Sequence, residues 1–110
     1  MSRNSSNQQG MVLSNTIIHV ENAIIEEVVA YTGRTGYVLI SFGVTDESNM
    51  FSMQEVRLNV GNNTVIMDEG GSSLNLYDLR EGMRIDGDFS SAMTRSIPPQ
   101  SPAYRVQVLK

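Results

Sequence analysis

The sequence contains no cysteine and no tryptophan, and its only histidine is His19. Without cysteine the chain can form no disulfide framework, thiol nucleophile or thiolate metal site. A histidine metal site needs further ligands, and a general base needs an orienting partner, so we predict a structural role for His19. The sequence also has no evident Ser–His–acid set and no phosphate-cradling glycine loop. We therefore expect no cofactor, no bound metal ion and no enzymatic activity.

Long apolar runs are also missing. No stretch approaches the roughly 20 residues that a membrane-spanning helix requires. The first ten residues, MSRNSSNQQG, lack the apolar core of a signal peptide, which predicts a cytoplasmic protein. An extracytoplasmic location stays open if the chain is a processed fragment. Because these ten residues are polar and low in complexity, we expect a disordered tail at 1–10 and a single domain at 11–110.

Basic residues are few and unevenly placed. The formal net charge is −4: residues 1–79 contain three arginines against nine acidic residues, whereas residues 80–110 contain five basic residues against three acidic ones. An acidic body disfavours general nucleic-acid binding, because counterion release from phosphates is its main driving force. A protein or a second copy of this chain therefore stays open as the partner.

Short alternating runs of β-branched and aliphatic residues are what the sequence does contain. Two of them, Asn22–Tyr31 and Tyr37–Val44, flank the turn-forming segment TGRTG at 32–36 and predict a hairpin. The apolar residues of the first run also have helical spacing, but their β-branching favours a strand. Gly33–Gly36 matches the four-residue loop with which KH domains clamp a nucleic-acid backbone. That loop needs a helix on each side, so we interpret the segment as a hairpin turn.

Four further strands are expected, at 50–60, 64–67, 83–89 and 104–108. In the first of these the apolar residues change parity, which predicts a bulge near Gln54–Glu55. Gly87 is expected to be close-packed, and DLREG at 78–82 predicts one helical turn ended by Gly82. Six short strands without a long helix predict an all-β fold, either a small OB-like β-barrel or a coiled antiparallel sheet.

All three prolines fall between residues 98 and 102, between the last two expected strands. Proline fixes φ and has no N–H, so the run should continue neither strand and should form a stiff connector. Pro99–Pro102 also matches the PxxP core of polyproline ligands, but Arg95 is one residue too far upstream for the usual basic flank. We favour a connector packed across a barrel end over a displayed binding surface.

Residues 77–109 contain, in order, an Asp-Leu-x-x-Gly turn, a serine- and methionine-bearing loop, a Pro-Gln segment and an alanine-led terminal strand. These elements are DLREG at 78–82, SAMTRSIPPQ at 91–100 and AYRVQV at 103–108. With them the stretch resembles a group of small β-barrel domains of unknown function from Gram-positive, especially clostridial, bacteria. The resemblance implies the barrel fold and an extracytoplasmic or regulatory setting, and it implies no catalytic residues. The loop at 46–49 and the missing export signal depart from that group.

Two carboxylates, Asp86 and Asp88, lie two residues apart on one expected strand and so share a face. They alternate with an apolar stripe, so we interpret them as solvated residues with Arg84 as their ion-pair partner. A hydrolase using this pair is one alternative function. Another is an OB-type binder of oligonucleotides or oligosaccharides, which needs aromatic and arginine side chains on one face.

The function that we predict is a non-catalytic binding or interaction module with an unidentified partner. Its candidate ligand or partner surface combines the few aromatic and basic residues of the expected strands with the proline run. The candidate residues are Tyr37, Phe42, Arg84, Arg95, Pro98, Pro99, Gln100, Tyr104 and Arg105.

Overall fold

The computed structural model describes residues 16–110, and the expected tail at 1–10 lies outside them. The fold is all-β, as predicted, and its only helical element among the described residues is the short 3₁₀ turn η2 (Leu76–Asp78). No helix in this part of the chain is long and apolar enough to span a lipid bilayer. The strands are β2 (Ile17–Ala30), β3 (Gly36–Thr45), β4 (Phe51–Val60), β5 (Val65–Asp68), β6 (Arg84–Ser90) and β7 (Gln100–Val108).

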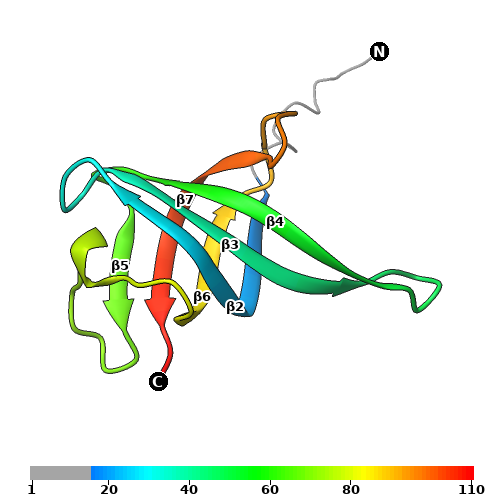
Figure 1. The fold of residues 1–110 in the computed structure, drawn as a ribbon, viewed down its shortest axis with the longest axis horizontal. Coiled ribbons are helices and arrows are strands. Elements are labelled where there is room, and N and C mark those ends of the chain that lie inside the picture. Colours follow the sequence, from blue (N-terminus) through cyan, green and yellow to red (C-terminus); the bar gives the residue numbers. More distant parts are fainter. Residues whose placement is uncertain (1–15) are drawn as a thin grey trace, which may run out of the picture.

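Five of the strands form a ring, which Figure 1 shows as a strongly coiled sheet. Antiparallel ladders join β4 to β3, β3 to β2, β2 to β6 and β6 to β7. A short parallel ladder between Arg57–Asn59 of β4 and Gln100–Pro102 of β7 then closes the ring. The second half of the same edge of β7 pairs with β5, which lies outside the five-strand circuit.

β2 is one long strand that changes partner midway. Ile17–Ile24 pairs with β6, and Ile24–Ala30 pairs with β3. The register shifts between Ile25 and Glu27, so one extra residue is inserted there and the core-facing residues become Ile25 and Val28. A bulge of this kind produces a three-residue spacing within a strand. The helical spacing seen in the sequence therefore comes from a bulge, and the strand interpretation of 22–31 is confirmed.

The core lies inside the ring and is filled by the inward residues of every ring strand. Alternation predicts one apolar face for Val38, Ile40 and Val44 of β3 and another for Ile85 and Phe89 of β6. Four of these residues are buried, as predicted, whereas Val44 is 38% exposed. Gly87 is not close-packed: a β-carbon there would meet no atom nearer than 3.7 Å. The buried hydrophobic residues are Val20, Ala23, Ile25, Val38, Ile40, Val56, Leu58, Val60, Ile66, Leu76, Leu79, Ile85, Phe89, Ala103 and Val106.

The predicted bulge at Gln54–Glu55 is wrong, because β3 and β4 pair in unbroken register from Gly36–Val60 to Thr45–Phe51. The far half of this hairpin, residues 42–54, pairs with no other strand in the described part of the chain and extends from the ring as the arm (Figure 1). Phe51 and Met53 lie on the arm and stay 65% and 56% exposed. They lie on the face of β4 opposite to that of the buried Val56, Leu58 and Val60, and this explains the change of parity in the sequence.

β7 ends at Val108, as predicted, but it differs from the prediction in its start and in the face that Tyr104 occupies. It begins at Gln100, so Pro102 is part of the strand. The β6–β7 ladder ends at Phe89–Ala103, so no donor is required of Pro102 on that side. A register shift next to this pair turns Tyr104 outward to 41% exposure, whereas Ala103 and Val106 are buried. The alternation of Tyr104, Val106 and Val108 in the sequence predicts that all three share one apolar face, and for Tyr104 this is wrong.

The helical turn predicted at 78–82 lies slightly earlier in the chain, at η2. Asn75 caps it: its side chain accepts the N–H of Tyr77, and the Asp78 side chain accepts the N–H of Asn75. Gly82 follows in a turn with φ of +88°, a left-handed conformation that favours glycine. The turn then delivers the chain to β6.

Candidate functional site

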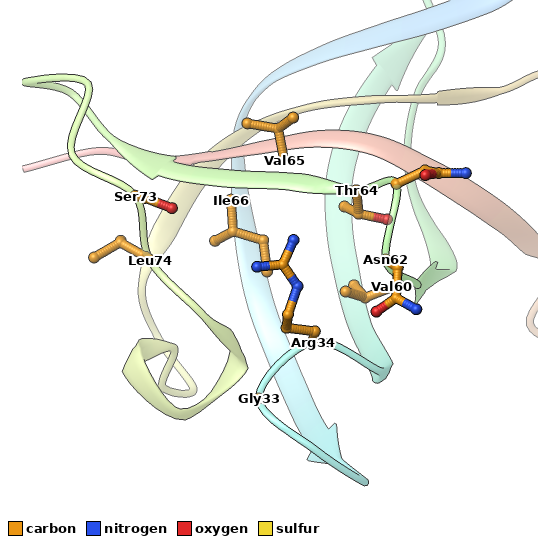
Figure 2. Close-up of a pocket in the computed structure, with 10 residues that line it drawn as sticks. Gly33, Arg34, Val60, Asn62, Thr64, Val65, Ile66, Ser73 and Leu74 are labelled. Carbon is orange, nitrogen blue, oxygen red and sulfur yellow. The ribbon is translucent and has the colours of Figure 1, made fainter.

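A pocket of about 150 Å³ lies at the end of the ring where the β2–β3 turn approaches β5. Figure 2 shows the Arg34 guanidinium extending from that turn toward β5, with Ser73 and Asn62 on opposite sides. Segment Gly33–Gly36 is thus a hairpin turn with strands on both sides, as predicted. The pocket is lined by Gly33, Arg34, Val60, Asn62, Asn63, Thr64, Val65, Ile66, Ser73 and Leu74.

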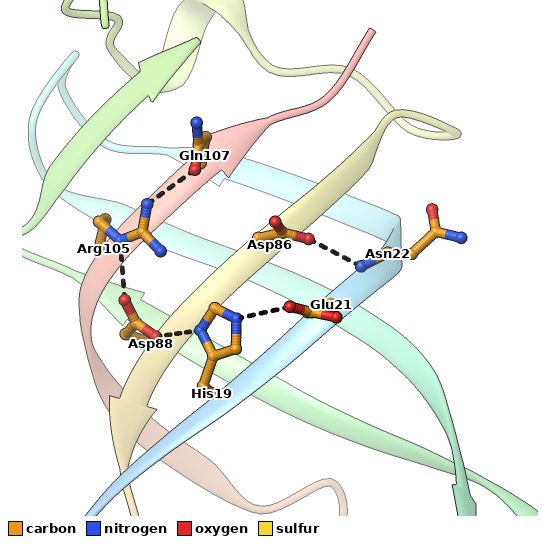
Figure 3. Close-up of polar contacts among 7 residues, drawn as sticks. All are labelled: His19, Glu21, Asn22, Asp86, Asp88, Arg105 and Gln107. Carbon is orange, nitrogen blue, oxygen red and sulfur yellow. Dashed lines mark hydrogen bonds and ion pairs between the residues drawn. The ribbon is translucent and has the colours of Figure 1, made fainter. Parts of the chain in front are cut away.

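A second feature is a polar network on the outer face of β2, β6 and β7 (Figure 3). His19 Nδ1 lies 2.5 Å from one carboxylate oxygen of Asp88, and Arg105 Nε donates to the other oxygen at 2.7 Å. His19 Nε2 also lies 3.4 Å from a carboxylate oxygen of Glu21. The network exists because the register pairs Asp88 with His19 on one side and with Arg105 on the other.

The network shifts the pKa values of both His19 and Asp88. The hydrogen bond with Asp88 raises the pKa of His19, and the attraction of Asp88 and Glu21 for the imidazolium adds to the effect. Burial acts to raise the pKa of Asp88, but the hydrogen bonds from Arg105 and His19 outweigh it and lower that pKa. The network therefore favours a charged His19 beside a charged Asp88.

Asp86 and Asp88 share a face, as predicted, but their partners differ from the prediction. Asp86 accepts the backbone N–H of Asn22 at 2.9 Å, within the bulge where Asn22 has φ of +58°. Arg84 donates to the backbone oxygen of Asn22 and ion-pairs with neither aspartate. Each carboxylate thus stabilises local β2 structure. Among residues 16–110, no group of three or more histidine and acidic side chains could hold a metal ion.

Stability should depend on pH through His19, the only histidine of the chain. Its pKa in the folded protein is raised above the ordinary 6.5. Its contribution is therefore complete below about pH 6.5 and is lost as the pH rises through the folded value. We expect His19→Gln to lower the melting temperature more at pH 5.5 than at pH 8.5. An equal loss at both pH values would show that the imidazolium makes no contribution.

The candidate residues from the sequence do not gather on one surface. Tyr37 and Phe42 lie on opposite faces of β3: Tyr37 donates to Glu27 and stacks beneath Arg57, whereas Phe42 packs against Phe89 in the core. Arg105 is bound to Asp88 and adjoins the exposed Tyr104 on β7, whereas the exposed Arg95 lies on the proline loop, residues 91–99. Gln100 accepts a long hydrogen bond from Asn59, while Pro98 and Pro99 line a groove.

That groove, the acidic groove, runs between the arm and the proline loop and has a volume of about 480 Å³. Ser41 donates a 2.6 Å hydrogen bond to Glu26 in it, and Glu55 supplies a second carboxylate. Ile97 stands at its rim and is 99% exposed. No basic residue lines the groove. The lining residues are Glu26, Ser41, Met53, Gln54, Glu55, Ile97, Pro98 and Pro99.

The edge of β4 beside the acidic groove is an unpaired strand edge. Arg57 N–H donates to Pro99 O at 2.9 Å, so the backbone groups of Arg57 point away from β3. Alternation along the strand points those of Glu55 and Met53 the same way. In the parallel ladder the next donor to β4 would be the N–H of residue 99, which proline lacks. The ladder therefore stops, and in the described residues no strand pairs with this edge before Arg57.

Comparison with known proteins adds no relative to these observations. No protein-family model, no curated protein and no solved structure matches this chain. The resemblance of residues 77–109 to Gram-positive barrel domains therefore stays a prediction.

Of the residues that line the acidic groove, the sequence predicted Pro98 and Pro99 as candidates but not Glu26, Met53 and Ile97. The parity change at 51–53 was the available signal, since it marked apolar side chains that face away from the core.

Proposed function

We propose that this protein is a non-catalytic binding module that takes up an extended segment of a protein partner along the free edge of β4. The observation that carries the proposal is this edge, at Met53 and Glu55 beside the acidic groove, with which no strand of residues 16–110 pairs. Unpaired backbone N–H and C=O groups on a strand edge are a template for a further strand. Added strands gain affinity from backbone hydrogen bonds and specificity from side-chain pockets.

The chemistry of the groove defines the partner. Glu26 and Glu55 supply two carboxylates, the described lining residues include no basic one, and Met53 and Ile97 supply exposed apolar surface. A segment that alternates apolar residues with lysine or arginine would complement both features. A second copy of this chain is less well matched, because it would add its own net charge of −4 to an acidic surface.

The ring supports the same location by analogy. OB-fold barrels have five strands and bind ligands on the face of their second and third strands, between the loops that follow the first and fourth. Counted along this ring, those strands are β3 and β4, and the loop after the fourth is the proline loop. This support is analogy at the level of fold, and the residues of the edge carry the proposal.

The alternative functions receive less support. An oligonucleotide or oligosaccharide binder would need aromatic and arginine side chains together, yet Tyr37 and Phe42 occupy opposite faces and Arg105 is held by Asp88. For a hydrolase, Asp86 and Asp88 are both engaged by the backbone of Asn22 or by charged partners. We therefore favour the binding module.

The test is selection of peptides from a random display library on the full chain, followed by affinity measurement of the selected peptides by calorimetry. We expect them to be rich in lysine or arginine alternating with apolar residues. Glu55→Gln should weaken their binding about two- to fivefold, because one exposed charge pair contributes up to about 1 kcal/mol. Glu81→Gln is the matched control, because it makes the same change at an exposed residue that does not line the acidic groove.

Two results would contradict the proposal. One is a library that yields no peptide above background. The other is an equal loss of affinity in Glu55→Gln and Glu81→Gln, which would reflect net charge alone. A mass that doubles with concentration in light scattering, and returns to monomer in Glu55→Gln, would assign the edge to a second copy.

A further inference from the structure

We infer that the end pocket around Arg34 is a binding site for a small tetrahedral oxyanion, with phosphate as the representative ligand. The site is separate from the free edge of β4, because its lining residues come from the β2–β3 turn, the β4–β5 turn and the segment before η2. The acidic groove shares none of these residues.

Arg34 is the charged group of this site. Its backbone N–H bonds to the Thr32 hydroxyl, which fixes the turn, but within residues 16–110 its guanidinium has no hydrogen bond and no ion pair. The side chain nevertheless extends over the pocket toward β5 (Figure 2). A guanidinium presents a planar fork of N–H donors that matches two oxygens of a phosphate or carboxylate. Arg34 is thus an exposed donor, without a partner among residues 16–110, that extends over an open pocket.

The other polar side chains of the pocket are neutral and able to donate. Asn62, Asn63 and Ser73 form no side-chain hydrogen bonds within the described part of the chain. Thr64 is already engaged, since its hydroxyl donates to Ala103 O and accepts from Gly61 N–H. No acidic residue lines the pocket. The end pocket therefore has a positively charged lining, whereas the lining of the acidic groove is negatively charged. A positive lining with neutral donors favours an anion.

Size and donor placement narrow the class of ligand. At about 150 Å³ the pocket is below the roughly 300–1,000 Å³ of sites for drug-sized molecules, so the part of a ligand that enters it is a group of a few atoms. A carboxylate has two oxygens, which the Arg34 fork alone would satisfy. Donors on the two other segments need further oxygens, and a tetrahedral oxyanion provides them. The phosphate could be free or the end of a phosphomonoester.

The experiment is an amide-resolved NMR titration of the full chain with inorganic phosphate, glycerol 3-phosphate and acetate at constant ionic strength. We expect saturable shifts for both phosphates at Gly33, Arg34, Asn62 and Ser73, and weaker binding of acetate. Tighter binding of glycerol 3-phosphate would identify a phosphomonoester as the source, and tighter binding of inorganic phosphate would identify the free ion.

Arg34→Gln should lower the affinity for phosphate about tenfold or more, because it removes the charged fork. Arg34→Lys should recover only part of it, because an ammonium keeps the charge but loses the bidentate geometry. Arg95→Gln is the control, since Arg95 is exposed and lies outside the pocket. Shifts that do not saturate, equal losses in Arg34→Gln and Arg95→Gln, or acetate binding as tight as phosphate would each overturn the inference.

Discussion

Replacing Phe89 with alanine is expected to lower the free energy of unfolding by about 3–5 kcal/mol, the usual range for a buried phenylalanine. Phe89 is fully buried and is one of the largest side chains of the core. Its ring also lies at a tilt to that of Phe42, with centroids 6.4 Å apart. Because small domains have total stabilities of about 5–15 kcal/mol, this single change should bring the protein close to unfolding. Urea denaturation followed by circular dichroism measures it.

Phe51→Ala is the matched control, because it makes the same substitution on the arm, where the side chain is 65% exposed. We expect it to cost less than about 1 kcal/mol. If Phe89→Ala does not fold, Phe89→Leu should fold and cost less than about 1.5 kcal/mol. Equal losses from the two alanine variants would contradict the core described here, since the arm would then be as tightly packed as the ring.

Gly36→Ala should be the second severe change, with a loss of about 2–5 kcal/mol from combined backbone strain and overpacking. Gly36 has φ of +152°, a conformation that side chains rarely adopt. A β-carbon there would also lie only 2.1 Å from the carbonyl oxygen of Val29 and 3.0 Å from Leu76 Cδ1. The carbonyl belongs to the neighbouring strand and cannot move aside without disturbing the hairpin. Thermal unfolding of the variant gives the measurement.

Gly61→Ala provides the comparison for Gly36→Ala. A β-carbon at Gly61 would meet no atom within 4 Å, so we expect a change of less than about 1 kcal/mol in either direction. If the two variants were equally stable, the close approach of Gly36 to β2 would be wrong. If both were strongly destabilised, flexibility of the turns and not steric fit would explain the glycines.

Much of the fold could be predicted because local patterns agree with the final packing. In β3 and β6 every second residue faces the core, so alternation alone locates Val38, Ile40, Ile85 and Phe89. Prediction failed where a residue's surroundings depend on the ring. Phe51 and Met53 resemble core residues in sequence, but they belong to an arm that pairs only with β3. Tyr104 turns outward because β7 shifts register against β6, which the sequence of β7 does not reveal.

The candidate sites were harder to predict because they join distant parts of the chain. His19, Asp88 and Arg105 lie together because of the register between β2 and β6 and the register between β6 and β7. In the sequence alone, each of them has the pattern of a solvent-exposed side chain. The acidic groove needs β2, β3, β4 and the proline loop at once. The end pocket combines Arg34 with residues of two later segments. The sequence shows the charge of each of these residues, whereas which residues lie beside one another depends on how the sheet closes.

The ladder that closes the ring has a consequence for the order of folding. It consists of only three residue pairs, from Arg57–Gln100 to Asn59–Pro102, and it joins segments that are far apart in sequence. The hairpin of β2 and β3 and the hairpin of β3 and β4 are local and can form early, whereas the ladders of β2 with β6 and of β4 with β7 join distant residues and carry a larger loop-closure cost. We therefore expect the meander of β2, β3 and β4 to form before β6 and β7 pair with it. The three residue pairs between β4 and β7 then close the ring beside the free edge of β4.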